Sequence, residues 1–247
     1  MGWAGLPPHH KHSYKEKRVQ IAKKYAPTNL GEVIYPNDAV RIRIQAYMSG
    51  QLEGNLLLWG PNGTGKTSVA DLLPQYIGGS SAQVDTDFES ILKRVDLNAY
   101  IANSCSVADL CEHKKYFMVF HEFDNAKSHV DALWTAMDKY ADKLMVIITT
   151  NNPMSVHKSL RSRCDEIAFP ALSARQVLSR AQKILTAEGI DLPDAQVLHY
   201  LTQIEHFGDL RKYFNKLDEI AYLHTTGGHF PPAPNLVIKP RIKFSVV

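Results

Sequence analysis

The sequence predicts an α/β fold, in which a parallel five-stranded sheet is flanked by helices and followed by a small helical domain. Short apolar runs indicate the strands, and they lie at residues 55–59, 82–85, 116–120, 144–149 and 166–169. Helix-like stretches separate these runs at residues 65–77, 88–113 and 127–141. Strands that alternate with helices are typical of a parallel sheet whose two faces are both covered.

The strand pattern ends after Pro170, and three amphipathic stretches follow at residues 173–188, 194–206 and 209–224. Glycine or proline residues separate them, at Gly189, Pro193 and Gly208. We therefore expect four parts: a basic N-terminal arm at residues 1–24, an α/β domain at 25–170, a three-helix domain at 171–225, and a Gly/Pro-rich and then basic tail at 226–247.

The composition is that of a globular protein with a small excess of positive charge. Of the 247 residues, 45% are apolar and 9% aromatic, and these values argue against disorder. The formal charge of +3 permits a local nucleic-acid-binding surface but does not require one. No apolar run approaches the roughly 18 residues of a membrane span, and the N-terminus lacks the apolar core of a signal peptide. We therefore expect a cytoplasmic protein with no membrane partner.

The three cysteines, Cys105, Cys111 and Cys164, show no disulfide-framework pattern. Cys105 and Cys111 could instead form a metal cluster together with His113. Their spacing lacks the CxxC pairs of structural zinc sites, and this favours ordinary thiols.

The segment GPNGTGKT at residues 60–67 matches the phosphate-binding pattern G-x-x-x-x-G-K-[ST] in full, between an apolar run and a helix-like stretch. Glycines let backbone N–H groups curl around a phosphate at the N-terminus of a helix. Lys66 would reach the β- and γ-phosphates of ATP, and the Thr67 hydroxyl would hold Mg²⁺. The expected nucleotide-binding residues here are Gly60, Pro61, Asn62, Gly63, Thr64, Gly65, Lys66, Thr67 and Ser68.

The segment MVFHEFDNAKS at residues 118–128 ends an apolar run with His121 and Glu122. A buried strand that ends in Asp-Glu positions Mg²⁺ and an attacking water in many nucleotide hydrolases. Here a histidine takes the place of the aspartate, and a neutral imidazole brings no negative charge, whereas a protonated one repels the ion. Because Mg²⁺ prefers oxygen ligands, His121 is a poor metal ligand, and Asp124 could compensate if the strand ends late. Glu122 could still polarise the water. We expect ATP binding to survive and hydrolysis to be slowed.

Four segments in order over residues 23–225 resemble the clamp-loader clade of the AAA+ ATPases, which includes replication factor C small subunits and phage clamp loaders. KKYAPTNLGEVIYPNDA is similar to the segment that opens these proteins, and VFHEFDNA to their Walker B strand. VIITTNNPMSVHKSLRSRC resembles their sensor 1 strand and Ser-Arg-Cys element, and FGDLRKYFNKLDEI resembles their sensor 2 helix. The resemblance implies an AAA+ P-loop fold with a helical lid domain, ATPase activity, and ATP and Mg²⁺ as cofactors.

The resemblance also implies roles for single residues. Tyr25, Val33 and Ile34 would flank the adenine. Four residues would be catalytic. Glu122 would polarise the water, Asn151 would belong to sensor 1 and Arg211 to sensor 2. Arg163 would be the arginine finger offered to the ATP of a neighbouring subunit. The residues alone leave simpler interpretations open, with Arg163 as a surface arginine and Arg211 as a partner of Asp209 or of a helix C-terminus.

The sequence departs from the family at three points. Ala26 stands where the arginine of a Tyr-Arg-Pro triplet is usual, and His121 stands in place of the aspartate that orients Mg²⁺. We expect no counterpart of the collar domain through which the family forms pentamers, because only residues 226–247 follow the third predicted helix of the lid.

Candidate DNA contacts follow from the same resemblance. Lys93, Arg94, Lys114 and Lys115 lie in the region between the second and third strands that matches the DNA-facing surface of the family. Solvated helix faces are the alternative interpretation of these four residues. The basic arm and the tail residues Lys239, Arg241 and Lys243 are further candidates.

We therefore expect a clamp-loader-like AAA+ ATPase that couples nucleotide binding and hydrolysis at subunit interfaces to action on DNA and a protein partner in DNA replication. It would be a homo- or hetero-oligomer of AAA+ subunits, with DNA and a sliding clamp or another replication protein as partners. Two alternatives stay open. One is another DNA-directed AAA+ machine, such as a helicase loader or transposition regulator. The other is a weakly hydrolysing nucleotide-dependent scaffold, which His121 favours.

Overall fold

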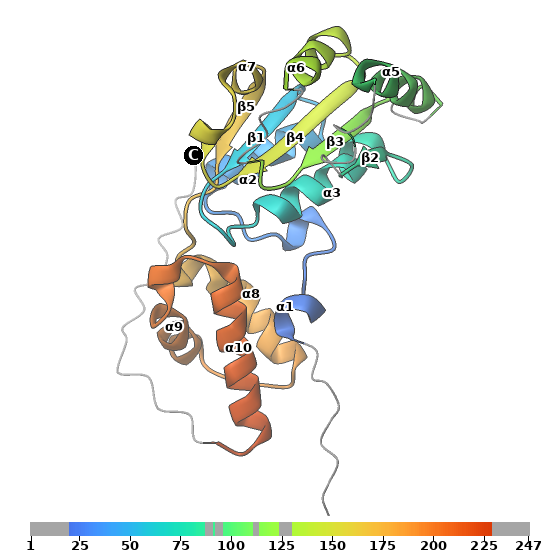
Figure 1. Cartoon of the computed structure of the whole chain (residues 1–247). Helices are drawn as coiled ribbons and strands as arrows, with labels where there is room; N and C mark the ends of the chain where they lie inside the picture. The colour runs from blue at the N-terminus through green and yellow to red at the C-terminus, as the bar shows by residue number, and fades with distance from the viewer. Residues whose placement is uncertain (1–19, 87–90, 92–95, 111–113, 124–129, 229–247) are drawn as a thin grey trace, which may run out of the picture.

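A computed structural model describes residues 20–86, 91, 96–110, 114–123 and 130–228. Its centre is a sheet of five parallel strands in the spatial order β2-β3-β4-β1-β5 (Figure 1). The strands are β1 (Asn55–Trp59), β2 (Gln83–Asp85), β3 (Tyr116–Phe120), β4 (Leu144–Thr150) and β5 (Cys164–Ala168). The predicted parallel five-stranded sheet is confirmed.

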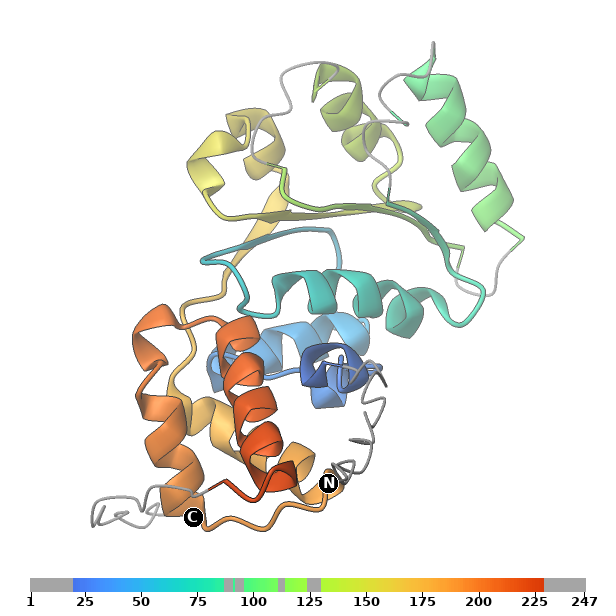
Figure 2. The ribbon, with the colours of Figure 1, turned by 60° about the horizontal axis from the view of Figure 1, so that its bottom comes forward.

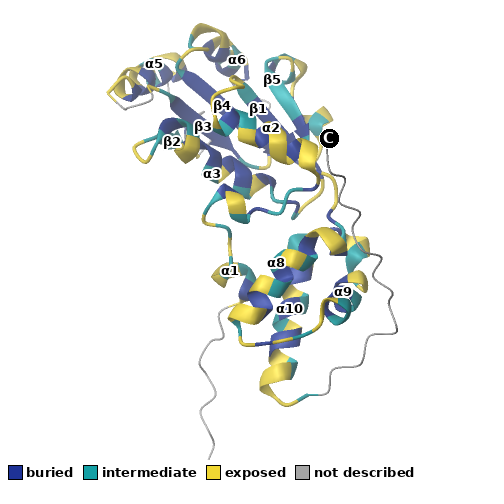
Figure 3. Cartoon of the chain, turned by 180° about the vertical axis from the view of Figure 1, so that it is seen from behind, coloured by how far each residue is buried: buried dark blue, intermediate teal, exposed yellow. Residues whose placement is uncertain are grey.

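The strands β3 and β4 are buried along their whole length (Figure 3). Continuous apolar runs are buried in this way in parallel sheets, because helices cover both faces of the sheet. Alternate residues of β3 therefore enter different cores. Tyr116 packs with residues of α5 and α6, whereas Phe117 packs with residues of α2 and α3.

Two layers of helices enclose the sheet (Figure 2). One layer holds α2 (Asp38–Met48) and α3 (Lys66–Gly78), and the other holds α5 (Leu97–Ala108), α6 (Val130–Lys139) and the short α7 (Lys158–Arg161). The helix expected over residues 88–113 is described from Leu97, where the Asp96 side chain accepts the N–H of Ala99 at 2.9 Å. None of the described helices could span a membrane.

Three helices follow the sheet: α8 (Ala174–Ala187), α9 (Asp194–Thr202) and α10 (Leu210–Thr225), with a 3₁₀ turn at Glu205–Phe207. Their apolar faces form a separate core that includes Val177, Leu201 and Leu217. Ser173 begins α8 with a capping box, in which its side chain and that of Gln176 bond each other's backbone N–H groups. This helical unit lies below the carboxyl ends of the strands in Figure 1.

The helix α1 (Ile21–Lys24) belongs to the helical unit, although it precedes the sheet in the chain. Ile21 is only 2% exposed, and its N–H donates to Asp218 Oδ1 at 3.1 Å. The end of the segment expected as a basic arm is therefore a packed helix. Residues 1–19 and the tail from residue 229 onward lie outside the described part of the chain.

The strand register gathers the loops that build the site. Trp59 is level with Thr150 and with Ala168, and Phe120 is level with Ile148. The residues that follow β1, β3 and β4 therefore meet at one edge of the sheet. Open α/β sheets bind their ligands at this carboxyl edge.

Candidate nucleotide site

The phosphate-binding loop leaves the sheet at Gly60, whose N–H donates to Thr150 O at 3.3 Å. Gly60 has a φ of +145°, and a Cβ there would lie 2.1 Å from Phe169 O. Only glycine combines this backbone conformation with so close a neighbour. The loop is therefore anchored between the ends of β4 and β5 before it turns toward α3.

Lys66 is the first residue of α3, and its side chain reaches back across the loop. Its ammonium donates to Gly60 O at 2.8 Å, to Pro61 O at 2.7 Å and to Asn151 Oδ1 at 3.2 Å. Lys66 is only 7% exposed, so this charge is largely removed from bulk water. The structure thus brings the lysine of the loop and the expected sensor 1 residue Asn151 together.

The loop is also held by its own side chains. Thr64 is buried, and its hydroxyl donates to Pro61 O at 3.0 Å. Gly65 takes the left-handed conformation at the N-cap of α3, with a φ of 95°. The first N–H groups of a helix have no partner within the helix, and they favour an anion at this position.

Glu122 follows β3 with a φ of +50°, an uncommon conformation for a residue with a side chain. Its N–H donates to Thr149 Oγ1 at 3.2 Å, and the next N–H, from Phe123, donates to Thr149 O at 3.0 Å. Thr149 at the end of β4 is 2% exposed. Strained backbone of this kind concentrates at functional sites, where neighbouring contacts hold it.

His121 faces α3 rather than the loop. Its Nε2 lies 2.8 Å from Oδ1 of Asp71, which is one helical turn beyond Thr67. Its Nδ1 is buried and has no hydrogen-bond partner among the residues that the structure describes. Asp124, the other candidate metal ligand near the end of this strand, lies outside the described residues.

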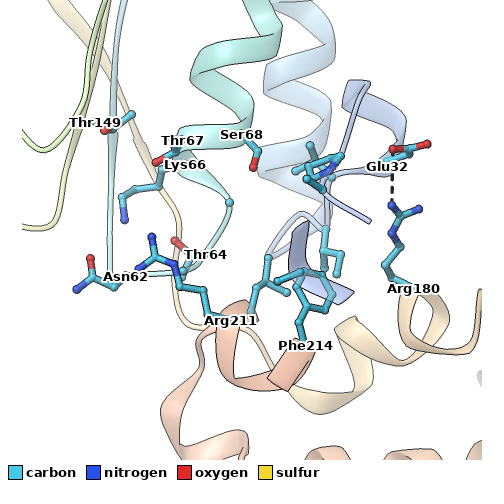
Figure 4. Close-up of a pocket in the computed structure, with 18 of the residues that line it drawn as sticks. Glu32, Asn62, Thr64, Lys66, Thr67, Ser68, Thr149, Arg180, Arg211 and Phe214 are labelled. Atoms are coloured by element: carbon cyan, nitrogen blue, oxygen red, sulfur yellow. Dashed lines mark ion pairs between the residues drawn. The ribbon is translucent and has the colours of Figure 1, made fainter. Parts of the chain in front are cut away.

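A cavity of about 280 Å³ lies between the sheet and the helical unit. Figure 4 shows side chains from both parts of the molecule pointing into it. Most of the expected site residues line it: Tyr25, Val33, Ile34, Asn62, Gly63, Thr64, Gly65, Lys66, Thr67, Ser68, Glu122, Asn151 and Arg211. Gly60 and Pro61 do not line the cavity. Their carbonyl oxygens accept hydrogen bonds from the ammonium of Lys66, which does.

The apolar end of the cavity contains Tyr25, Val33 and Ile34. The Tyr25 hydroxyl donates to Glu188 Oε1 at 2.7 Å, and this hydrogen bond, together with desolvation, raises the pKa of Tyr25. Arg180 donates to Tyr25 O at 3.2 Å and lies 3.6 Å from a Glu32 carboxylate oxygen. The partly apolar space beside these residues suits a purine base.

Several lining residues were not expected from the sequence. They are Ala22, Ala26, Pro27, Glu32, Thr149, Thr150, Arg180, Leu210 and Phe214. Phe214 could have been found, because it follows Arg211 by three residues and so lies on the same face of α10. Arg180 and Glu32 carried no such signal, since their 3.6 Å contact joins segments far apart in the sequence.

The N-terminus of α10 sits directly on the phosphate-binding loop. Leu210 N–H donates to Gly63 O at 2.8 Å, and a Cβ on Gly63 would lie 1.7 Å from Asp209 Oδ1. Asp209 caps the helix by accepting the backbone N–H of Arg211 at 2.8 Å. The Arg211 guanidinium points into the cavity on the side of Thr64 and Asn62 (Figure 4).

Arg163 does not line this cavity. Its Nε and Nη2 donate to the two carboxylate oxygens of Asp138 at 2.7 and 2.6 Å, and its Nη1 donates to Ser159 O at 2.8 Å. This guanidinium lowers the pKa of the Asp138 carboxyl. Arg163 therefore lies outside the chain's own cavity, and its guanidinium is bonded within the chain.

Of the candidate DNA contacts, Lys93 and Arg94 lie outside the described residues. Lys114 is exposed, whereas the Lys115 ammonium lies 3.3 Å from both Glu53 Oε2 and Asp142 O. Both lysines precede β3, and so they lie at the edge of the sheet opposite the cavity. His113 and Cys111 are also outside the described residues, and within the described part no group of acidic, histidine or cysteine side chains has the arrangement of a metal cluster.

Residues 56–172 match the family model described as ATPase family associated with various cellular activities (AAA). The chain is 25% identical to the replication factor C large subunit of Pyrococcus abyssi, over 82% of this chain and 42% of that protein. It is 27% identical to the replication factor C small subunit of Aeropyrum pernix, over 81% of this chain and 62% of that protein. It is also 27% identical to the sliding-clamp-loader large subunit of Enterobacteria phage T4, over 82% of this chain and 65% of that protein.

Among solved structures, the chain resembles the Thermotoga maritima RuvB Holliday junction branch migration motor, with a TM-score of 0.61 and 16% identity. The match covers 82% of this chain and 67% of that one, and at this identity it bears on the fold alone. The chain spans between about two fifths and two thirds of the length of the named replication relatives. The family match over residues 56–172, the parallel sheet and these relatives agree, and they indicate a AAA ATPase domain similar to those of clamp-loader subunits.

Proposed function

We propose that this chain binds ATP with Mg²⁺ and hydrolyses it as a subunit of a clamp-loader-like assembly. The observation that carries the proposal is one cavity in which Lys66, Asn151, Glu122 and Arg211 meet. These four residues come from α3, from the loops after β4 and β3, and from α10. A site that joins the sheet and the helical unit can couple the nucleotide to the position of that unit.

The cavity offers complementary groups for each part of ATP. The N-terminus of α3 and the Lys66 ammonium favour the phosphates, and the space beside Tyr25 and Ile34 favours the adenine. Arg211 adds a second cation from the helical unit. ATP would therefore draw α10 and the phosphate-binding loop together.

Mg²⁺ would neutralise charge on the phosphates. The donor set fits the ion in part, because Thr67 supplies a hydroxyl oxygen within the cavity and Glu122 supplies a carboxylate. His121 supplies nitrogen where an oxygen is preferred, although its partner Asp71 brings carboxylate oxygens next to it. Glu122 would hold and polarise the attacking water.

Assembly with other subunits is the second part of the proposal. Arg163 lies outside the chain's own cavity, as an arginine that serves a neighbour must. Such a residue contributes only when a second AAA+ subunit places its ATP against it. The active form would therefore be a homo- or hetero-oligomer.

DNA and a sliding clamp are the proposed partners. The support is the similarity to subunits named replication factor C and sliding-clamp loader. The mildly basic charge of +3 is compatible with contact to phosphates.

Measurements of turnover can test the whole proposal. ATP hydrolysis per subunit would be followed over a range of protein concentrations, with and without primed DNA, and with and without sliding clamps of archaeal and phage type. We expect turnover to rise with protein concentration and again with primed DNA and a matching clamp. A protein that binds ATP but whose turnover responds to none of these additions would contradict the clamp-loader role.

A further inference from the structure

The contact between His121 and Asp71 joins the end of β3 to the helix that follows the phosphate-binding loop. The two residues are 50 positions apart in the sequence, and 2.8 Å separates Nε2 from Oδ1. An ionised carboxylate can only accept a hydrogen bond, so Nε2 carries the proton that is shared between them. The hydrogen bond therefore fixes which nitrogen of the ring is protonated.

The other ring nitrogen is the unusual one. Nδ1 is buried, and no described residue forms a hydrogen bond with it. With Nε2 as the donor to Asp71, a lone pair on Nδ1 can accept a hydrogen bond. An unsatisfied buried polar atom costs free energy, and native proteins keep few of them. A metal-bound water is a strong donor that could satisfy Nδ1.

Asp71 also lies close to the expected metal position along its own helix. It follows Thr67 by four residues, so the two side chains lie on one face of α3. Side chains of a helix lean toward its N-terminus, and this lean carries the Asp71 carboxylate toward Thr67. Asp71 is about half exposed, and His121 is about a third exposed, so the pair lies near the surface rather than in the core.

We infer that Asp71 and His121 together replace the strand-end aspartate of the metal site. The imidazole occupies the strand-end position, and the Asp71 carboxylate supplies through it the negative charge that a histidine alone lacks. Carboxylates that orient metal-site histidines and raise their basicity act in the same way. The inference rests on the proposed binding of Mg²⁺–ATP, and Asp71 is a positioning residue in it.

A purely structural link between α3 and β3 would explain the 2.8 Å contact equally well. The two explanations differ in whether the effect of a substitution depends on Mg²⁺. Loss of a structural link lowers stability without regard to the metal, whereas loss of a charge at the metal site weakens nucleotide binding only when Mg²⁺ is present. The ratio of the ATP affinity in Mg²⁺ to that in EDTA therefore separates them.

The experiment uses the full chain and the fluorescent nucleotide mant-ATP, and it measures this affinity ratio for the parent and a set of variants. The central comparison is among the parent, Asp71→Asn, His121→Asp and the double variant. Glu219→Gln is the control, because it removes an equally exposed carboxylate on α10 that pairs with Lys216 at 2.7 Å. A parallel series with Mn²⁺ tests direct coordination, since imidazole binds that ion more readily.

We expect Asp71→Asn to lower the affinity ratio about tenfold, which is the usual scale for a residue that supports a metal ligand. In the His121→Asp background the same substitution should cost less than about twofold, because the strand end then carries its own carboxylate. Asp71→Glu should recover part of the loss. The unfolding temperature of each variant shows that the proteins compared are folded.

An Asp71→Asn ratio equal to that of Glu219→Gln would overturn the inference. An equal loss in both backgrounds would do the same, since it would mean that the two positions act independently. A parent that binds Mn²⁺–ATP far more tightly than Mg²⁺–ATP, with no effect of Asp71→Asn, would point to direct imidazole ligation and would also overturn it. A parent whose affinity for mant-ATP equals that of Lys66→Ala would instead contradict the proposed function.

Discussion

The guanidinium of Arg163 is held in two parallel hydrogen bonds by Asp138 of α6, at 2.7 and 2.6 Å. Because the pKa of Asp138 is held below its ordinary value, the carboxylate stays charged and the pair persists at neutral pH. The pair would be lost only as the pH falls through this lowered pKa. An arginine offered to a neighbour's ATP must leave Asp138 first.

Arg163→Ala should leave ATP affinity intact and lower turnover about 10³-fold, because in the proposed assembly the arginine would stabilise charge on the phosphoryl group bound by a neighbouring subunit. Mant-ATP binding and phosphate release measured on the same preparation would check this. Arg161→Ala is the matched control, since it removes a nearby arginine that likewise pairs with a carboxylate of its own chain, Glu166 at 3.0 Å. Turnover per subunit that is unchanged from dilute to concentrated parent protein would speak against an arginine acting between subunits.

Asp138→Asn should raise turnover about two- to fivefold at protein concentrations where assembly is incomplete, because an exposed ion pair offers only weak resistance to opening. Asp131→Asn on the same helix should have no effect. The rates would be compared over a dilution series. Slower turnover in Asp138→Asn would show that the carboxylate aims the arginine instead of restraining it.

Lys66→Ala should weaken ATP binding at least about 30-fold, because a charge-assisted contact to the phosphates contributes about 2 kcal/mol or more. Equilibrium binding of mant-ATP measures the effect. Lys115→Ala removes another lysine of low exposure that lies at the opposite edge of the sheet, and its ATP affinity should match the parent. Equal affinities in Lys66→Ala and the parent would mean that the phosphates bind elsewhere.

His121→Asp should raise kcat about three- to tenfold with little change in ATP affinity, because an ordered metal shell stabilises the transition state more than the ground state. Glu122→Gln in the same background should remove the gain. Steady-state hydrolysis with saturating Mg²⁺ is the measurement. An Asp variant no faster than the parent would show that the metal is already fully held.

Gly63→Ala should weaken ATP binding about tenfold by forcing a methyl group against Asp209, 1.7 Å from Oδ1, and so lifting α10 from the loop. Gly50→Ala is the control, because Gly50 also has a positive φ, of 70°, but no atom within 4 Å of its Cβ position. Binding and thermal unfolding would be measured for both. If both variants lose affinity alike, backbone strain alone is responsible.

Most strand bounds could be predicted from the apolar runs, and β5 is the exception. β1, β3 and β4 are continuous apolar runs, and their bounds follow directly. β5 begins two residues earlier than expected, with Cys164, Asp165 and Glu166. It is an edge strand, and residues outside the sheet pair with its charged side chains. Asp165 accepts from the Tyr47 hydroxyl at 3.0 Å, and Glu166 pairs with Arg161.

In the candidate site, residues of a local sequence motif could be predicted, whereas residues that depend on distant partners could not. The phosphate-binding loop follows from a local motif, so Lys66 and its neighbours could be named from the sequence. Asp71 could not, because its partner His121 is 50 residues away and an aspartate in an exposed helical position carries no signal by itself. Contacts between distant segments, such as that of Arg180 with Glu32, become visible only in the fold.

The chain crosses twice between the sheet and the helical unit, because α1 packs against α10 while Leu30 already belongs to the core beside α3. The second crossing lies between Phe169 and Leu172, which belong to these same two cores. The first of these crossings runs along the cavity wall at Tyr25. A nucleotide in this cavity would therefore contact one of the two segments that join the helical unit to the sheet.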